Sequence, residues 1–90
     1  PATATLTSVA SSAVSVTILA ANAARRHAVI VNDGNKTLKL AFAATASLTA
    51  YTVALSGGNT YETPKDGYTG IITGIWDSAN GSARVTEVTA

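Results

Sequence analysis

Apolar and polar residues alternate along three stretches of the chain, at 14–18, 38–42 and 51–55. A period of two is typical of β-strands that bury one face, so each stretch is expected to turn its apolar side chains toward a core. A fourth stretch, 28–31, is apolar on both faces and predicts a central strand that is buried on both faces or at an interface. The alternating residues expected in the core are Val14, Val16, Ile18, Leu38, Leu40, Phe42, Tyr51, Val53 and Leu55.

Clusters of turn-forming residues separate these stretches, at 32–35, 56–59, 64–67 and 79–82. They consist mainly of Asn, Asp, Gly, Pro and Ser, which favour tight turns. The first cluster, Asn-Asp-Gly-Asn, is a strong signal for a β-hairpin. We therefore expect seven or eight strands, near 3–10, 13–20, 27–32, 37–43, 51–55, 60–63, 70–76 and 83–88.

The abundance of alanine, especially in 41–54, could suit a helix. Thr and Ser interrupt this stretch repeatedly, and β-branched residues lose side-chain freedom in a helix while packing well on a sheet. We expect no long helix. The pattern predicts an all-β fold, a single antiparallel β-sandwich or jelly-roll-like barrel of about seven or eight short strands.

The chain is short and poor in charge. Its 90 residues allow one domain with a small core, and the absence of cysteine excludes disulfides. Charged residues make up 12% of the chain, against roughly 25% in ordinary soluble domains. Because a partner surface is the remaining reinforcement for so small a domain, we expect a homo-oligomer, with a trimer favoured, or a subunit bound to a larger shell. A neutral monomeric surface is the alternative.

The charges are unevenly placed. Residues 25–39 hold four basic residues and one acid, a balance of +3, whereas residues 62–87 hold two basic residues and four acids, a balance of −2. Ends of opposite sign could steer head-to-tail contacts, and scattered solvated charges are the alternative. The formal net charge of +1 argues against nucleic acid, which needs clustered Lys and Arg.

No stretch approaches the roughly 18 apolar residues that span a membrane. Residues 1–24 also lack the basic start and continuous apolar run of a secretion signal. A first residue of proline is what remains when an initiator methionine is removed. We therefore expect a protein made in the cytoplasm, in its mature form and without a membrane partner.

Residues that usually perform catalysis are scarce. The single histidine, His27, is expected to be a surface or strand-edge residue rather than a base, because no nucleophile signature surrounds any serine. The four acids of the second half fall on different expected elements, so they do not predict a catalytic pair. These acids are Glu62, Asp66, Asp77 and Glu87. We expect no enzyme and no catalytic residue.

Cofactor and metal motifs are incomplete. Gly67, Gly70 and Gly74 lack the Lys-Ser/Thr ending of a phosphate loop and are expected to serve bends and close approaches in a β structure. Asp33 and Asn35 match part of a calcium loop, but the far ligand is missing, so a plain turn is favoured. We expect no cofactor-binding and no metal-binding residue.

The few aromatic residues have two interpretations. Tyr61, Tyr68 and Trp76 gather in the second half, with Phe42 and Tyr51 upstream. They either pack the end of the core or offer an exposed anchor to an inter-subunit pocket. The core role is favoured for Trp76, because three isoleucines share its expected strand.

The second half also carries a resemblance. The pieces GYTG at 67–70, GIW at 74–76 and ANGSARVTE at 79–87 resemble the closing segment of small β-rich structural proteins of tailed bacteriophages. Shorter pieces upstream fit the same pattern, so that the resemblance covers about 25–87. They are RR at 25–26, VND at 31–33, YTV at 51–53 and YETP at 61–64.

The resemblance implies a non-enzymatic virion component, foremost a capsid decoration or cement protein that stabilises the head. A tail or head-fibre component is the alternative. Its partner would be the major capsid protein or another virion protein, and its location the virion, assembled in the host cytoplasm. Two other hypotheses stay open: a carbohydrate- or cell-surface-binding module that uses an exposed Trp76, and a small hydrolase with His27 near an acid and a serine.

The uncharged, Ala/Thr/Ser-rich residues 1–24 lie outside the resemblance. They form either an arm or the first strands, and residues 25–90 form the remainder of the single β domain. We expect residues 1–10 to add a strand to a neighbouring subunit or to lie across it. The candidate interface residues are Thr3, Thr5, Leu6, Arg25, Arg26, Tyr68 and Trp76.

Overall fold

The computed structural model describes residues 2–65 and 67–90. These residues contain eight strands and no helix. Two residues considered above lie outside the described residues: Pro1 of the N-terminal segment, and Asp66, one of the four acids of the second half. The all-β prediction is confirmed, and each strand begins and ends within three residues of its expected position. The strands are β1 (Thr3–Ala10), β2 (Val16–Leu19), β3 (Arg25–Asp33), β4 (Leu38–Ala41), β5 (Val53–Leu55), β6 (Thr60–Glu62), β7 (Ile72–Trp76) and β8 (Ser82–Thr89).

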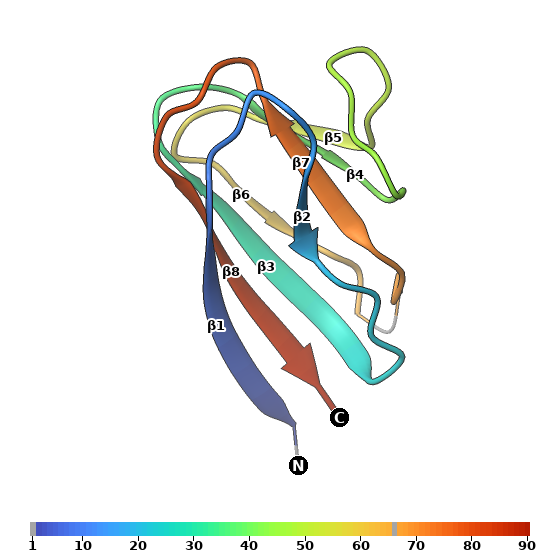
Figure 1. The fold of residues 1–90 in the computed structure, drawn as a ribbon. Helices are drawn as coiled ribbons and strands as arrows, with labels where there is room; N and C mark the ends of the chain where they lie inside the picture. Colours follow the sequence, from blue (N-terminus) through green and yellow to red (C-terminus); the bar gives the residue numbers. More distant parts are fainter. Residues whose placement is uncertain (1, 66) are drawn as a thin grey trace.

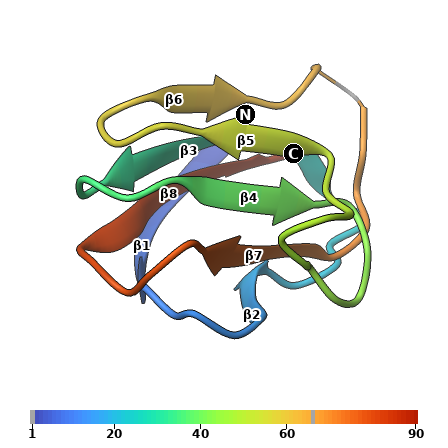
Figure 2. The same ribbon diagram turned by 90° about the horizontal axis from the view of Figure 1, so that it is seen from above.

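The strands form two four-stranded antiparallel sheets that pack as a sandwich (Figures 1 and 2). The first sheet has the order β1-β8-β3-β6 and the second the order β2-β7-β4-β5. Only β4 and β5 are both consecutive in the chain and paired with each other; every other connection crosses from one sheet to the other. This is the strand order of a jelly roll, in which eight strands form two Greek keys.

The cluster at 32–35 does not make the expected hairpin: Asn32 and Asp33 are the last residues of β3, and a bend at 34–36 follows. It leads from β3 in the first sheet to β4 in the second. The backbone N–H of Asn35 donates a hydrogen bond to Oδ1 of Asn80 at 2.9 Å, which ties this crossing to the one between β7 and β8. Turn-forming residues specify that the chain reverses, whereas the sheet that the next strand joins depends on distant neighbours.

The core lies between the two sheets and is centred on Trp76, which is fully buried. Its indole Nε1–H donates to Oδ1 of Asn32 at 3.2 Å, and the amide of Asn32 donates to the carbonyl oxygens of Lys36 and Leu55 at 2.7 and 2.9 Å. A buried polar group costs stability unless it is hydrogen-bonded, and this network satisfies both side chains. The core role favoured for Trp76 is therefore confirmed.

Seven of the nine residues expected in the core pack there, and Val14 and Tyr51 do not. Val14 precedes β2 and is 70% exposed, because β2 begins only at Val16. Tyr51 precedes β5 and is 46% exposed, with Nζ of Lys39 lying 5.1 Å from its ring centroid. The alternation of apolar and polar residues located the strands, but it extends to residues that lie just outside them.

The strand buried on both faces is β7, not β3. The β4–β5 loop, residues 42–52, covers the outer face of the second sheet, where Ala46 packs against Ala41 and Ile75. The hydroxyl of Thr73 donates to the carbonyl oxygen of Ala43 at 2.9 Å and holds this loop on the sheet. The expected burial of 28–31 on both faces is therefore wrong for the single chain: one face of β3 is buried and the other is not.

Candidate docking face

The outer face of the first sheet, here called the open face, carries apolar side chains that lie outside the core. In β3, Ala28, Ile30 and Asn32 are fully buried, so the alternating residues Val29 and Val31 point outward and are half-buried. Strand register extends the face, because directly opposite residues share a side of the sheet. The residues so placed on β1, β8 and β3 are Ala4, Leu6, Ser8, Arg84, Thr86, Val88, His27, Val29 and Val31.

A groove of about 280 Å³ crosses the open face above β8. Leu6 and Ser8 of β1 line one side, Val31 of β3 lines the other, and Arg84 and Thr86 of β8 lie between them. Leu6 is 75% exposed, the largest exposed fraction among the large hydrophobic residues of the described chain. An exposed apolar groove with a polar rim is typical of a protein–protein contact.

Arg84 is held in place at this groove. Its Nε–H donates to Oδ2 of Asp33 and its Nη1–H donates to Oγ of Ser8, both at 2.9 Å. The pair with Asp33 is exposed, so it contributes little to folding stability. The two hydrogen bonds together hold the guanidinium between β1 and β3, where it forms the polar end of the groove.

The two charged groups expected at opposite ends of the domain are instead joined by ion pairs. Three ion pairs each join one residue of 25–39 to one residue of 62–87. They are Arg25 with Glu87 at 2.9 Å, Lys39 with Asp77 at 3.5 Å, and Asp33 with Arg84 at 2.9 Å. The jelly roll interleaves the two halves of the chain, placing β3 beside β8 and β4 beside β7. Head-to-tail steering by charge is therefore not supported.

The strand β1 bounds the open face and is an edge strand. It pairs with β8 over its whole length, from Thr3 opposite Thr89 to Ala10 opposite Ser82, without a register shift. Of the two roles expected for residues 1–24, first strands or an arm, the described residues 3–10 form a first strand of the domain's own sheet. Thr3, Thr5 and Leu6, which are candidate interface residues, are exposed on it.

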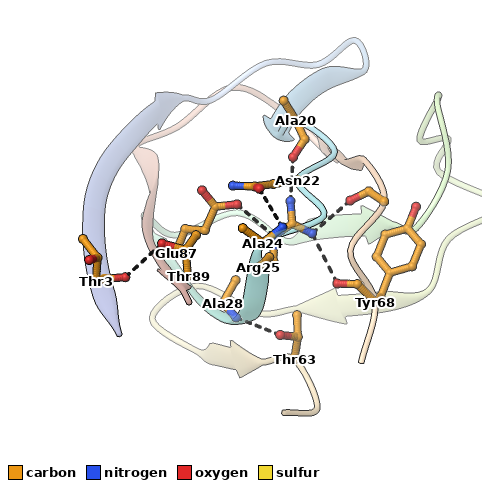
Figure 3. A network of polar contacts seen from close by, with 11 residues as sticks. Thr3, Ala20, Asn22, Ala24, Arg25, Ala28, Thr63, Tyr68, Glu87 and Thr89 are labelled. Atoms are coloured by element: carbon orange, nitrogen blue, oxygen red, sulfur yellow. Dashed lines mark hydrogen bonds and ion pairs between the residues drawn. The ribbon is translucent and has the colours of Figure 1, made fainter. Parts of the chain in front are cut away.

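Arg25, expected as an interface residue, is buried in the single chain, where its guanidinium makes the polar contacts drawn in Figure 3. Its guanidinium donates to Oε2 of Glu87 at 2.9 Å and to three backbone carbonyl oxygens in the β2–β3 and β6–β7 loops. These acceptors are Ala20 at 2.6 Å, Gly70 at 2.9 Å and Tyr68 at 3.3 Å. Its role in the single chain is to join two loops to β8. The adjacent candidate, Arg26, is exposed.

The remaining two interface candidates also serve the core. Trp76 is fully buried, so it has no surface to offer to a partner. The ring of Tyr68 stacks on Phe42 with centroids 4.4 Å apart, and Phe42 lies 6.3 Å from Tyr61 in a tilted arrangement. The Tyr68 hydroxyl donates to the carbonyl oxygen of Ile71 at 2.7 Å. These rings pack one end of the core, as the first of the two interpretations predicted.

The structure adds residues to the open face that the sequence analysis did not single out as interface residues, among them Val88 and Arg84. The sequence feature that could have identified this face is the stretch 28–31, because it is apolar on both faces and contains Val29 and Val31. His27 also lies on this face, in the central strand β3 rather than at an edge, and its Nδ1 has no hydrogen-bond partner within the described part of the chain.

The described residues contain no group of three or more His, Asp or Glu side chains placed to hold a metal ion. Asp33, considered above as part of a calcium loop, is the last residue of β3, and its carboxylate pairs with Arg84. Within the same residues, no helix has the length and apolar character needed to cross a membrane.

Comparisons of the chain with protein-family models, with curated proteins and with solved structures found no match.

Proposed function

We propose that the chain is a non-enzymatic structural protein of a tailed-bacteriophage particle, foremost a capsid decoration or cement protein that docks on the head through the open face. The observation that supports docking is the contrast between the two sheets. The chain covers the outer face of the second sheet with its own β4–β5 loop, whereas Leu6, Val29 and Val31 on the first sheet remain exposed or half-buried.

The open face has the composition of a contact surface. Its centre is aliphatic, and its one guanidinium, Arg84, is already paired with Asp33. Fully burying an exposed aliphatic side chain contributes about 1.5–3 kcal/mol and a half-buried one contributes less, so Leu6 is expected to supply the largest share of the contact. A jelly roll alone does not imply a function. The assignment to a virion rests on the resemblance over 25–87.

The same face could serve a tail or head-fibre component, and the identity of the bound protein distinguishes these positions on the particle. The carbohydrate-binding hypothesis loses its main support, because it requires an exposed Trp76 and this side chain is fully buried.

The test is binding of the purified chain to expanded heads of the phage that carries its gene, measured by co-sedimentation. We expect saturable binding. Val29→Lys should abolish binding while the far-UV circular dichroism stays that of a folded β protein, since a half-buried outward position can accommodate the flexible lysine chain. Ala54→Lys is the matched control, because Ala54 is exposed on β5 of the other sheet.

Failure of the wild-type chain to bind heads would refute the decoration role. Binding of Val29→Lys as tight as that of Ala54→Lys would show that another surface makes the contact.

A further inference from the structure

The four edge strands of the sandwich are protected against pairing to different degrees. β5 and β6 have three residues each, and β2 has four with a register shift at 17–19. Short edges and bulges are the usual devices that prevent a strand from pairing with another chain. The fourth edge, β1, has eight residues, no register shift, and no proline or charged residue from Thr3 to Ala10. It is the edge with none of these protections.

The backbone groups that β1 presents at its free edge follow from its pairing with β8. The N–H of Ser11 donates to the carbonyl oxygen of Gly81 at 3.1 Å, one step beyond the pair of Ala10 with Ser82. Hydrogen-bonded and non-hydrogen-bonded pairs alternate along an antiparallel ladder. The odd-numbered residues of β1 therefore bond to β8, and the even-numbered residues direct their N–H and C=O groups away from it.

We infer that two copies of the chain join through these free edges, with the β1 strands antiparallel and a two-fold axis at Leu6. Leu6 of one copy then faces Leu6 of the other, and Ala4 faces Ser8. The two four-stranded sheets become one continuous sheet, as happens when a strand is added to a free edge. An edge that pairs with itself is isologous, so the contact closes at two copies rather than three.

The side chains suit this register. Directly opposite residues share a face, so both Leu6 side chains lie on the open face, with Cα atoms about 5.5 Å apart. This contact covers one flank of the large apolar side chain that is most exposed in the single chain, at 75%. The two grooves, each bounded by Leu6, then adjoin across the seam.

Charge also favours a second copy as the occupant. The charged side chain nearest the seam on the open face is Arg84, which lies opposite Ser8. The two-fold axis places the two Arg84 residues at opposite ends of the seam, four residues and three strand spacings apart, or roughly 20 Å. This separation exceeds the Debye length of about 8–10 Å at physiological salt, so their repulsion is screened.

The test is sedimentation velocity of the whole chain over a wide concentration range, which should show a reversible equilibrium between monomer and dimer. Leu6→Lys and Leu6→Glu each place like charges opposite one another at the axis and should weaken the dimer about tenfold or more. An equimolar mixture of the two variants should associate again, because Lys then faces Glu. Val14→Lys is the matched control, a residue 70% exposed outside β1.

A second pair of variants tests which backbone groups face the free edge. Ala4→Pro removes an N–H at the free edge and should yield a folded monomer. Thr5→Pro removes an N–H that faces β8 and should lower the free energy of unfolding. Equal loss of stability in both variants would contradict the assignment of even-numbered residues to the free edge.

The inferred dimer rests on the proposed structural role, but different results would refute the dimer and the role. A wild-type chain that stays monomeric or forms trimers overturns the two-fold contact, as does a mixture of the Lys and Glu variants that associates no better than either alone. Loss of the dimer in Val14→Lys would overturn it as well. A dimer that does not bind heads refutes the decoration role, and a monomer that binds them refutes only the contact.

Discussion

Replacing Arg25 by methionine is expected to remove most of the stability of this domain. The Arg25 side chain is fully buried and donates to Oε2 of Glu87 and to three carbonyl oxygens. Those oxygens belong to Ala20, Tyr68 and Gly70. Methionine fills a similar volume but has no donor. The Glu87 carboxylate, whose side chain is only 17% exposed, would then lose its partner.

The expected loss follows from the cost of a buried charge without its partner. Removing one member of a buried ion pair typically destabilises a protein by about 3–5 kcal/mol. Each carbonyl left without a donor adds about 1–3 kcal/mol where water cannot reach it. A domain of 90 residues has about 5–13 kcal/mol of total stability. Arg25→Met should therefore leave the folded state marginal.

Urea unfolding followed by the fluorescence of Trp76 measures this loss, because Trp76 is the single tryptophan and is fully buried. Arg26→Met is the matched control: the adjacent arginine is exposed, so its replacement should change stability by less than about 0.5 kcal/mol. Adding Glu87→Leu to Arg25→Met should recover part of the loss, because it removes the unpaired carboxylate. The reasoning is refuted if Arg25→Met and Arg26→Met unfold at the same urea concentration.

Two further predictions concern the crossing between β7 and β8 and the core. Gly81 has φ of 72°, and a Cβ there would overlap the backbone oxygen of Asp33, so Gly81→Ala should cost more stability than Gly58→Ala, where φ is 84° but the space is open. The strained φ alone costs about 1–2 kcal/mol, and equal urea midpoints would show that the overlap is relieved. Trp76→Ala should cost about 3–5 kcal/mol, measured by circular dichroism on heating, and wild-type emission typical of water-exposed indole would contradict its burial.

The positions of the strands could be predicted from the sequence because period-two alternation and turn residues are local signals. The pairing of strands could not. The segment 32–35 has the residues of a hairpin, yet β3 pairs with β8 and β6 while β4 joins the other sheet. Which sheet a strand enters depends on contacts with residues far along the chain, such as the bond from Asn35 to Asn80, and these leave no local pattern.

The candidate docking face, too, could be predicted from the sequence only in part. Ile75 and Val29 are both β-branched residues in apolar stretches, and both point away from the central core. Ile75 is buried because Ala46 of the β4–β5 loop packs on it, whereas Val29 is half-buried on the open face. The sequence could mark 28–31 as a possible interface, but only the placement of that loop separates the covered face from the open one.

The two proposals are physically coupled, because Leu6 borders the groove of the open face and also lies at the axis of the inferred seam. If both hold, a dimer presents two open faces on one continuous sheet. Once one face binds a repeating shell, the second contact becomes intramolecular, and such linkage can raise overall affinity by about 10²–10⁴-fold without any new contact. Ala4→Pro, which blocks the seam but changes no residue that lines the groove, should then weaken head binding. If this monomeric variant binds heads as tightly as the wild-type chain, a single open face is sufficient and the dimer has no part in docking.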